Sequence, residues 1–170
     1  MTSLDKPKEE LDYSITRSQA LPTTTDGVWQ VISTPGILAE CHPFCSQNLV
    51  EKWPGVGSKD KIYYYSGLVL EREFTTWIDG VGYDLKARTE EGLRYRVSWR
   101  ITPEEDLQSS LSITIKPHSE ERVEQYARLL GRYLEQVLQG IEYYIRSGNP
   151  VSRNQFGSHR LFSPPVPVEG

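Results

Sequence analysis

The side chains best suited to chemistry lie together in the segment Cys41-His42-Pro43-Phe44-Cys45, which invites a metal or redox interpretation. On a helix the two sulfurs would share a face, but a zinc site normally needs four ligands, and the sequence holds no second Cys or Cys–His cluster. His118 and His159 would have to come from distant parts of the chain. We therefore expect two buried thiols and no metal, and we keep His42 as a candidate general base.

Arg72 is the second candidate catalytic residue. It alternates with Leu70 and Phe74, so its guanidinium is expected among buried apolar side chains. An isolated buried charge is very costly. Arg72 must therefore meet an internal acidic partner, turn outward at a strand bulge, or reach a carboxylate or phenolate of a ligand, and the sequence leaves these possibilities open.

Motifs of familiar enzyme classes are missing from the sequence. There is no G-x-S-x-G nucleophile turn and no G-x-G-x-x-G after a strand, and Gly55-Val56-Gly57-Ser58-Lys59 lacks the spacing of a phosphate-binding loop. We interpret this glycine stretch as a hairpin loop or as a lid. No cofactor is predicted.

The middle of the chain must supply the strands that position these residues. Large apolar side chains alternate there with polar ones, most regularly from Leu93 to Ile101, where five apolar groups share one face. Breaks at glycines and acidic turns divide this part of the chain into consecutive antiparallel strands, expected near residues 49–52, 61–66, 68–78, 81–87, 93–101 and 107–115.

Helices are expected on both sides of these strands. An extended segment over residues 11–20 leads into two short helices, whose apolar residues lie between Val28 and Ile32 and between Ile37 and Phe44. A long helix is expected from Ser119 to Ser147, because apolar residues recur there every three or four positions.

Two glycines stand inside that long helix. Gly131 and Gly140 each cost about 1 kcal/mol relative to Ala in a helix interior. Their presence indicates close packing or a bend.

Composition limits the partners that this chain can have. It has 170 residues, of which 37% are hydrophobic, enough for a single globular core. The net charge of −4 and the position of Lys86, Arg88, Arg94, Arg96 and Arg100 near acidic residues predict a solvated, salt-bridged outer face and no nucleic-acid partner. No apolar run reaches 18 residues and no signal sequence is apparent, so we expect no stable membrane insertion and a cytoplasmic location.

The ends of the chain have a different character from its middle. Residues 1–10 are polar and read as a disordered arm, and residues 148–170 are rich in proline and read as a disordered tail. The expected folded domain spans residues 11–147.

The order of elements resembles that of the START-domain, pollen-allergen and polyketide-cyclase superfamily, called SRPBCC. The resemblance covers about residues 11–147 and is carried by ALPTTTDGVWQVISTPGILAECHPF, YYYSGLVLEREFTTWIDGVGYDL and RYRVSWRI. It implies an α+β helix-grip fold, in which a curved antiparallel sheet of about six or seven strands, with two short helices, holds one long C-terminal helix over an apolar cavity.

Alternation then predicts which side chains face that cavity. Many of them are aromatic, so they either fill a core or offer hydroxyl groups to a planar ligand. The candidate ligand-binding residues are Tyr64, Leu68, Arg72, Phe74, Tyr83, Tyr95, Val97, Trp99, Leu111, Tyr126, Leu130 and Tyr133, and Leu70, Leu85, Ile113 and Val137 share their faces.

Two functions follow from this interpretation, and a third remains. The first is binding or transport, without catalysis, of a small hydrophobic ligand such as a lipid, quinone, isoprenoid or aromatic polyketide. The alternative that the resemblance allows is a cyclase, aromatase or dehydratase acting on such a ligand, with His42, Arg72 and tyrosines as the visible catalytic candidates. A protein-interaction module with a filled interior is the third, because fold alone does not decide function. The sequence does not indicate an oligomeric state.

Overall fold

The computed structural model describes residues 14–117 and 123–157. Its elements follow the order expected from the sequence, with two short helices after the first strand and one long helix at the end. They are β1 (Ile15–Leu21), α1 (Thr25–Ile32), α2 (Leu38–Cys41), β2 (Cys45–Lys52), β3 (Lys59–Tyr64), β4 (Val69–Ile78), β5 (Gly82–Thr89), β6 (Arg94–Pro103), β7 (Ser109–Pro117) and α3 (Val123–Ser147).

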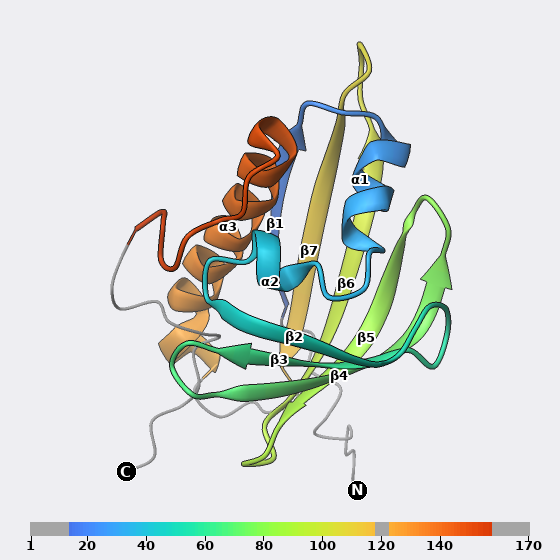
Figure 1. Ribbon diagram of the computed structural model, residues 1–170. Helices are drawn as coiled ribbons and strands as arrows, with labels where there is room; N and C mark the ends of the chain where they lie inside the picture. The colour runs from blue at the N-terminus through green and yellow to red at the C-terminus, as the bar shows by residue number, and fades with distance from the viewer. Residues whose placement is uncertain (1–13, 118–122, 158–170) are drawn as a thin grey trace, which may run out of the picture.

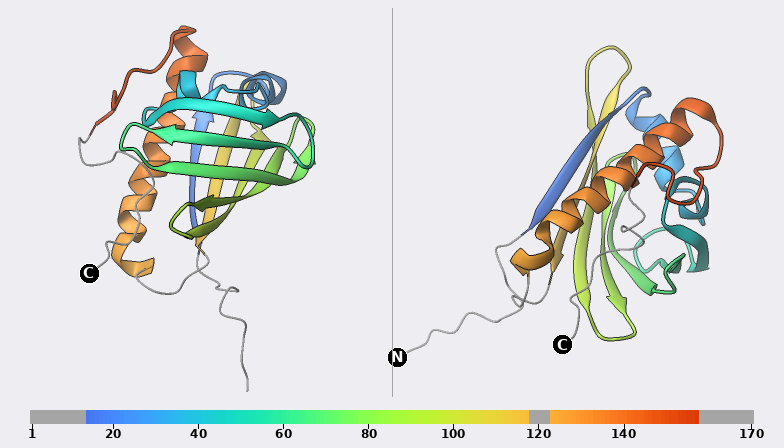
Figure 2. Two further views of the ribbon diagram at one scale, coloured as in Figure 1. Left: turned by 60° about the horizontal axis from the view of Figure 1, so that its bottom comes forward. Right: turned by 90° about the vertical axis from the view of Figure 1, so that its left-hand side faces the viewer.

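The described strands form one antiparallel sheet with the order β1-β7-β6-β5-β4-β3-β2. The sheet is strongly curved, because β2, β3 and β4 run across the view of Figure 1 whereas β1, β7 and β6 run from top to bottom. Helix α3 crosses the concave side next to β1, and α1 covers another part of the same side (Figures 1 and 2). This is the α+β helix-grip architecture that the sequence predicts.

Strands β6 and β7 follow the alternation of their sequences closely. Tyr95, Trp99 and Ile101 are buried on β6, and they pair with Pro117, Ile113 and Leu111 of β7. The prediction fails only at the start of β7, because Leu107 is 79% exposed. Leu107 has a positive φ angle and lies in the turn between the two strands, so it never joins the apolar face.

Helix α1 is fixed to the sheet by aromatic side chains. The Thr24 side chain accepts a hydrogen bond from the Gly27 amide and caps the helix. The indole of Trp53 donates to the Ser33 carbonyl and the hydroxyl of Tyr83 donates to the Ile32 carbonyl, each at 2.9 Å. Both bonds satisfy carbonyls at the C-terminal end of α1. We call the rings packed beneath this helix the aromatic cluster: Trp29, Trp53, Phe74, Trp77, Tyr83 and Trp99.

A register shift in β4 brings one more ring into that cluster. Phe74 pairs with Leu85 but Thr76 pairs with Asp84, so Thr75 is an extra residue in β4. Alternation reverses after the extra residue, and the ring of Trp77 stacks on Tyr83 with centroids 5.4 Å apart. The bulge lies three residues beyond Arg72, which therefore keeps its inward direction.

Both glycines of α3 mark close approaches. A Cβ on Gly140 would overlap the carbonyl oxygen of Cys41, so α2 and α3 touch through their backbones at this point. A Cβ on Gly131 would meet only the guanidinium of Arg17 from β1. Close packing therefore explains Gly140, whereas the neighbour of Gly131 is the end of a flexible side chain. The expected N-cap of α3, Ser119, lies outside the described residues.

The segment after α3 differs from the disordered tail that the sequence predicts. Residues 148–157 form no helix or strand, but the amides of Val151 and Asn154 donate to the carbonyls of Glu40 and Pro43. Val151 is buried, and the ring of Phe156 packs on Tyr143 of α3. Backbone hydrogen bonds and one apolar anchor thus hold this segment against α2 and α3, a role that its proline content does not reveal. Residues 158–170 lie outside the described part.

Candidate functional site

The candidate site is a cavity lined by α3, α2 and strands β3 to β7. Its volume is about 50 Å³, and most of its walls are aliphatic or aromatic side chains. Leu130, Tyr133, Leu134 and Val137 of α3 face it together, because positions separated by three, four and seven residues share one side of a helix. The space holds a few water molecules, since one water needs roughly 10–15 Å³.

Most of the predicted ligand-binding residues line this cavity. Tyr64, Arg72, Tyr95, Val97, Trp99, Leu130 and Tyr133 do so, as do the face-sharing residues Leu70, Leu85, Ile113 and Val137. His42, the candidate general base, also reaches the wall. The sequence interpretation missed Leu38, Ile62, Ala87, Ile115 and Leu134. Ile62, Ala87 and Ile115 each stand two positions from a residue that was predicted to face the cavity. The same alternation could therefore have identified them.

Four predicted cavity residues lie elsewhere. Phe74 and Tyr83 point to the concave face as expected, but they belong to the aromatic cluster beneath α1. Leu111 is fully buried two residues from Ser109, whose hydroxyl donates to Thr23 near the start of α1. Leu68 is half-buried in the β3–β4 turn, before β4 begins. The side chain of Tyr126 lies outside the described part of the chain.

Arg72 forms an internal ion pair, which is one of the alternatives left open by the sequence. Its Nε and Nη2 atoms donate to the two carboxylate oxygens of Asp60 at 2.8 and 2.7 Å. Asp60 stands opposite Arg72 in the β3–β4 register, and both side chains are at least 95% buried. The guanidinium also lies 4.9 Å from the centroid of the Phe74 ring. This bidentate geometry is the strongest form of such a pair.

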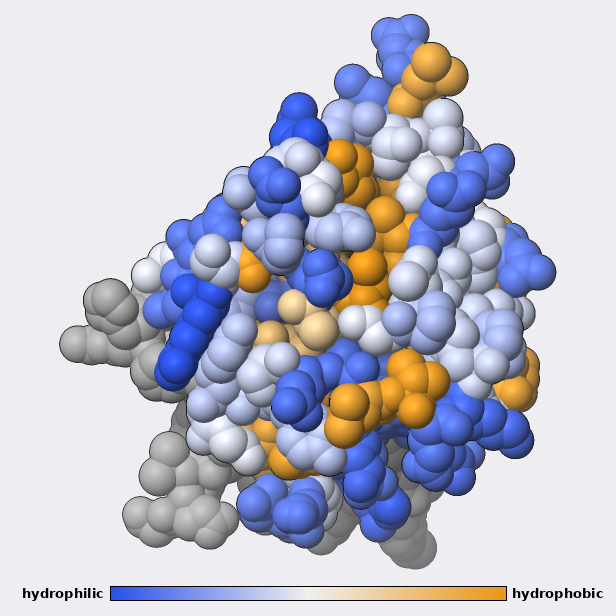
Figure 3. Space-filling view, viewed as in Figure 1, coloured by the Kyte–Doolittle hydropathy of each residue, from blue (hydrophilic) through white to orange (hydrophobic). Residues whose placement is uncertain are grey.

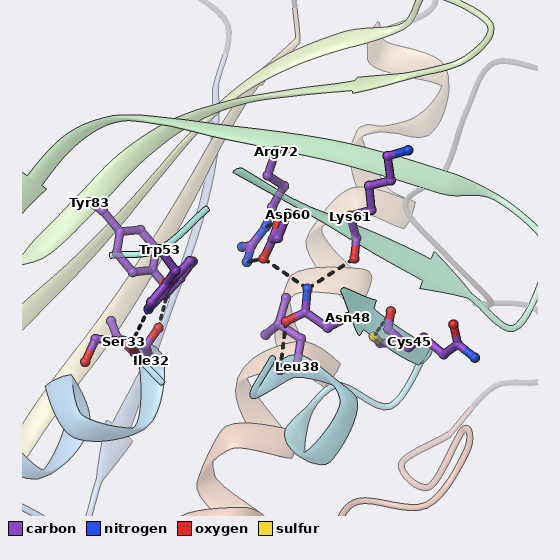
Figure 4. Close-up of polar contacts among 11 residues, drawn as sticks. Ile32, Ser33, Leu38, Cys45, Asn48, Trp53, Asp60, Lys61, Arg72 and Tyr83 are labelled. Atoms are coloured by element: carbon purple, nitrogen blue, oxygen red, sulfur yellow. Dashed lines mark hydrogen bonds and ion pairs between the residues drawn. The ribbon is translucent and has the colours of Figure 1, made fainter. Parts of the chain in front are cut away.

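Asn48 extends the ion pair toward α2, as Figure 4 shows. Its Nδ2 atom donates to Asp60 and to the Lys61 carbonyl, and its Oδ1 atom accepts from the Leu38 amide. Burial would raise the pKa of Asp60, but Arg72 and Asn48 together hold it below its ordinary value. The network therefore ties β4, β3, β2 and α2 together with its charges balanced inside the protein.

His42, Tyr133 and Tyr64 form a second buried polar group on the cavity wall. The Phe44 amide donates to Nδ1 of His42 at 3.1 Å, and Nε2 of His42 lies 3.0 Å from the hydroxyl of Tyr133. That hydroxyl lies 2.9 Å from the hydroxyl of Tyr64. Burial, together with the charge of Arg72, lowers the pKa of His42 to about 3. His42 is thus neutral near pH 7, and both of its ring nitrogens are engaged.

The two cysteines are free and buried, as the sequence predicts. Burial raises the pKa of each thiol to about 12, and the Cys45 thiol donates to the Gln47 carbonyl. Neither cysteine lines the cavity. Among the residues that the structure describes, no three His, Cys, Asp or Glu side chains gather as metal ligands would.

The outer face of the sheet carries the predicted charges. Arg88 pairs with Glu71 at 3.2 Å and Arg100 with Asp84 at 3.0 Å. On the side of the molecule shown in Figure 3, apolar atoms form a narrow strip between α1 and α3 and a patch over β2. Leu49 and Val50 of β2 are among the exposed apolar residues. None of the described helices has the length and hydrophobicity needed to span a membrane.

The curved sheet holds α3 on its concave side, with an apolar cavity between them. This arrangement defines a helix-grip protein. No family model and no curated protein matches the sequence. Solved structures do match, at 13–15% identity. DynU16, a protein of the dynemicin biosynthetic locus, superposes with a TM-score of 0.69 and 15% identity over 82% of this chain. The match covers 49% of DynU16, so this chain spans about half the length of that protein.

Two further matches cover nearly the whole of the other protein. Norcoclaurine synthase from Thalictrum flavum, solved with a transition-state analogue, has a TM-score of 0.64 and 14% identity over 80% of this chain and 95% of its own. Ara h 8.0201 has a TM-score of 0.62 and 13% identity over 79% of this chain and 98% of its own. These likenesses confirm the helix-grip fold that the sequence predicts.

Proposed function

We propose that this protein binds a small hydrophobic molecule in the cavity between its sheet and α3, and releases it unchanged. The observation that carries the proposal is the apolar cavity, whose walls come from five strands and two helices. A core built only for stability is normally packed without such space. Lipids, quinones, isoprenoids and aromatic polyketides are the candidate ligands.

The size of the cavity restricts how these ligands enter. Pockets for drug-sized molecules measure roughly 300–1,000 Å³, whereas this cavity measures about 50 Å³. A larger ligand therefore enters only if lining side chains change rotamer and α3 moves away from the sheet. Burial of its apolar surface, worth roughly 25 cal/mol per Å², opposes the cost of that movement.

Enzymatic cyclisation receives less support from the site. An acid–base mechanism needs a group that is free to take up a proton. Both nitrogens of His42 are hydrogen-bonded, and the Asp60 carboxylate is held by Arg72. The described residues that line the cavity include no acidic side chain. Norcoclaurine synthase is an enzyme with this fold, so turnover must still be tested directly.

Native mass spectrometry of the purified full chain, followed by organic extraction, tests the proposal. We expect a stoichiometric hydrophobic compound that leaves the protein on extraction and rebinds unchanged. Protein that is purified empty is titrated with toluene and followed by ¹H–¹³C methyl NMR, where saturable shifts at Ile113, Leu130 and Val137 are expected. An empty protein without saturable shifts would instead support an interaction module with a filled core. Chemical conversion of the extracted compound would support the enzyme.

The cytoplasmic location and the absence of a nucleic-acid partner stay predictions from the sequence.

A further inference from the structure

The donors and acceptors in the hydrogen bonds of His42, Tyr133 and Tyr64 are set by a backbone amide. Because the Phe44 amide donates to Nδ1 of His42, Nδ1 is an acceptor and the neutral ring carries its hydrogen on Nε2. Nε2 therefore donates to the hydroxyl oxygen of Tyr133. The tautomer of a buried histidine is thus set by a main-chain group that cannot reverse its role.

The same direction continues to Tyr64. Hydrogen bonds reinforce one another when each hydroxyl accepts one bond and donates the next. Either hydroxyl can be the donor in the 2.9 Å contact between Tyr133 and Tyr64, and in the cooperative arrangement Tyr133 accepts from His42 and donates to Tyr64. The hydroxyl hydrogen of Tyr64 is then left over, and no further acceptor for it occurs among the described residues. Tyr64 lines the cavity and is 3% exposed, so bulk water does not satisfy this donor.

Arg72 gives the cavity wall the same polarity. Its guanidinium has five N–H groups, and the carboxylate of Asp60 engages two of its nitrogens. Asp60 itself is not a lining residue. Described residues with carboxylate, carboxamide or aliphatic hydroxyl side chains are missing from the wall, so tyrosine hydroxyl groups supply the oxygens of its side chains.

From this arrangement we infer that the cavity selects neutral molecules that carry a hydrogen-bond acceptor, such as a ketone or quinone carbonyl, and that the Tyr64 hydroxyl binds this oxygen. The inference rests on the proposed function and narrows its ligand class. An ammonium group would lose its hydration in the apolar cavity and would meet no carboxylate on the described wall. A carbonyl oxygen satisfies the free Tyr64 donor and adds no new unsatisfied group.

Two small probes of nearly the same shape test this selectivity. Cyclohexanone carries a carbonyl where methylenecyclohexane carries a C=CH₂ group. The dissociation constants of both are measured by methyl NMR on the full chain, and the ratio of the alkene constant to the ketone constant gives the carbonyl preference. Removing the donor with Tyr64→Phe should lower this preference about tenfold, because a buried carbonyl then loses its partner.

Tyr83→Phe is the matched control. Tyr83 is also a fully buried tyrosine, but its hydroxyl donates to the Ile32 carbonyl and it does not line the cavity. The Tyr83→Phe variant should leave the carbonyl preference unchanged, although the substitution removes a buried hydrogen bond. Circular dichroism shows whether each variant is folded.

A second measurement needs no variant. The ¹³C resonance of carbonyl-labelled cyclohexanone bound to the unmodified protein should lie downfield of its position in cyclohexane, because a hydrogen bond polarises the C=O group. Equal carbonyl preference in Tyr64→Phe and the unmodified protein, or a bound ketone without the downfield shift, overturns the inference and leaves the proposed function standing. Failure of both probes to bind the unmodified protein overturns the proposed function as well.

Discussion

Asp60 and Arg72 face each other across β3 and β4 in a bidentate ion pair that is almost completely removed from solvent. The pair stands beside the cavity, and only Arg72 contributes to its wall. An arginine that first reads as an anchor for an anionic ligand is thus neutralised by the protein itself. The ligand of this cavity does not need a charge.

The ion pair predicts an asymmetric response to mutation. Asp60→Asn should destabilise the fold by about 3–5 kcal/mol, because it leaves the buried guanidinium without a counter-charge. Replacing both partners, as in Asp60→Leu/Arg72→Leu, should recover much of that loss. Urea unfolding followed by tryptophan fluorescence measures each free energy of unfolding.

An exposed pair on the neighbouring strands provides the control. Arg88 and Glu71 form a salt bridge with side chains 66% and 41% exposed. Arg88→Ala should therefore change the free energy of unfolding by less than about 1 kcal/mol. A small effect of Asp60→Asn, similar to that of Arg88→Ala, would contradict the desolvated-pair account.

The sequence predicts the faces of the strands better than it predicts their surroundings. Tyr64, Tyr95 and Trp99 line the cavity because alternation decides on which side of a sheet a residue lies. Phe74 and Tyr83 obey the same rule and still miss the cavity. The sheet curves so strongly that α1 covers one part of its concave side and α3 another (Figure 1). Curvature comes from three-dimensional packing and bulges, which alternation does not encode.

Asp60 could have been found from the sequence. The predicted strand began at Lys61, so the acidic residue was left in the preceding loop. The observed hairpin pairs Ile62 with Leu70 and Asp60 with Arg72. Extending the strand by one residue in an antiparallel hairpin around Gly67 would have identified the partner of Arg72. The His42–Tyr133–Tyr64 chain joins residues up to 91 positions apart, and no local pattern indicates it.

Neutral His42 predicts a pH-dependent stability. Its pKa in the folded protein is about 3, below the ordinary value of 6.5. Between these pH values the unfolded chain binds a proton that the folded protein does not. The contribution to stability is therefore complete above about pH 6.5 and is lost as the pH falls toward 3.

His42→Gln isolates this contribution. The free energy of unfolding of the unmodified protein should fall more steeply than that of the variant between pH 6.5 and pH 5, by about 1.4 kcal/mol for each pH unit. Urea unfolding at several pH values provides the slopes. His118 and His159 are present in both proteins, so their titration cancels in the difference. Parallel slopes would show that His42 is protonated in the folded state.

The two glycines of α3 predict opposite effects of one substitution. Gly140→Ala should destabilise the fold by about 2–3 kcal/mol, because the new methyl group meets the backbone carbonyl of Cys41 and forces α2 away. Gly131→Ala should be neutral or stabilising by up to about 1 kcal/mol, since only the mobile end of Arg17 must give way and Ala favours the helix. Thermal unfolding followed by circular dichroism compares them. Equal effects would mean that helix propensity alone governs both positions.

Partly filling the cavity should weaken ligand binding while keeping the fold. Ala87 is 2% exposed, lines the cavity from β5 and pairs with both Arg72 and Tyr95. Ala87→Val adds two methyl groups, so the space for a ligand shrinks and the side chain also favours a strand. We expect the free energy of unfolding to change by less than about 1.5 kcal/mol, because the added volume enters an existing space.

Binding should respond far more strongly than stability. The affinity of Ala87→Val for toluene, measured by methyl NMR, should be at least about tenfold weaker than that of the unmodified protein, which corresponds to roughly 1.4 kcal/mol. Ala20→Val is the matched control, because Ala20 is exposed on strand β1 and does not line the cavity. Undiminished affinity in Ala87→Val would place the toluene site outside the cavity. In that case the apolar strip between α1 and α3 seen in Figure 3 becomes the surface to probe next.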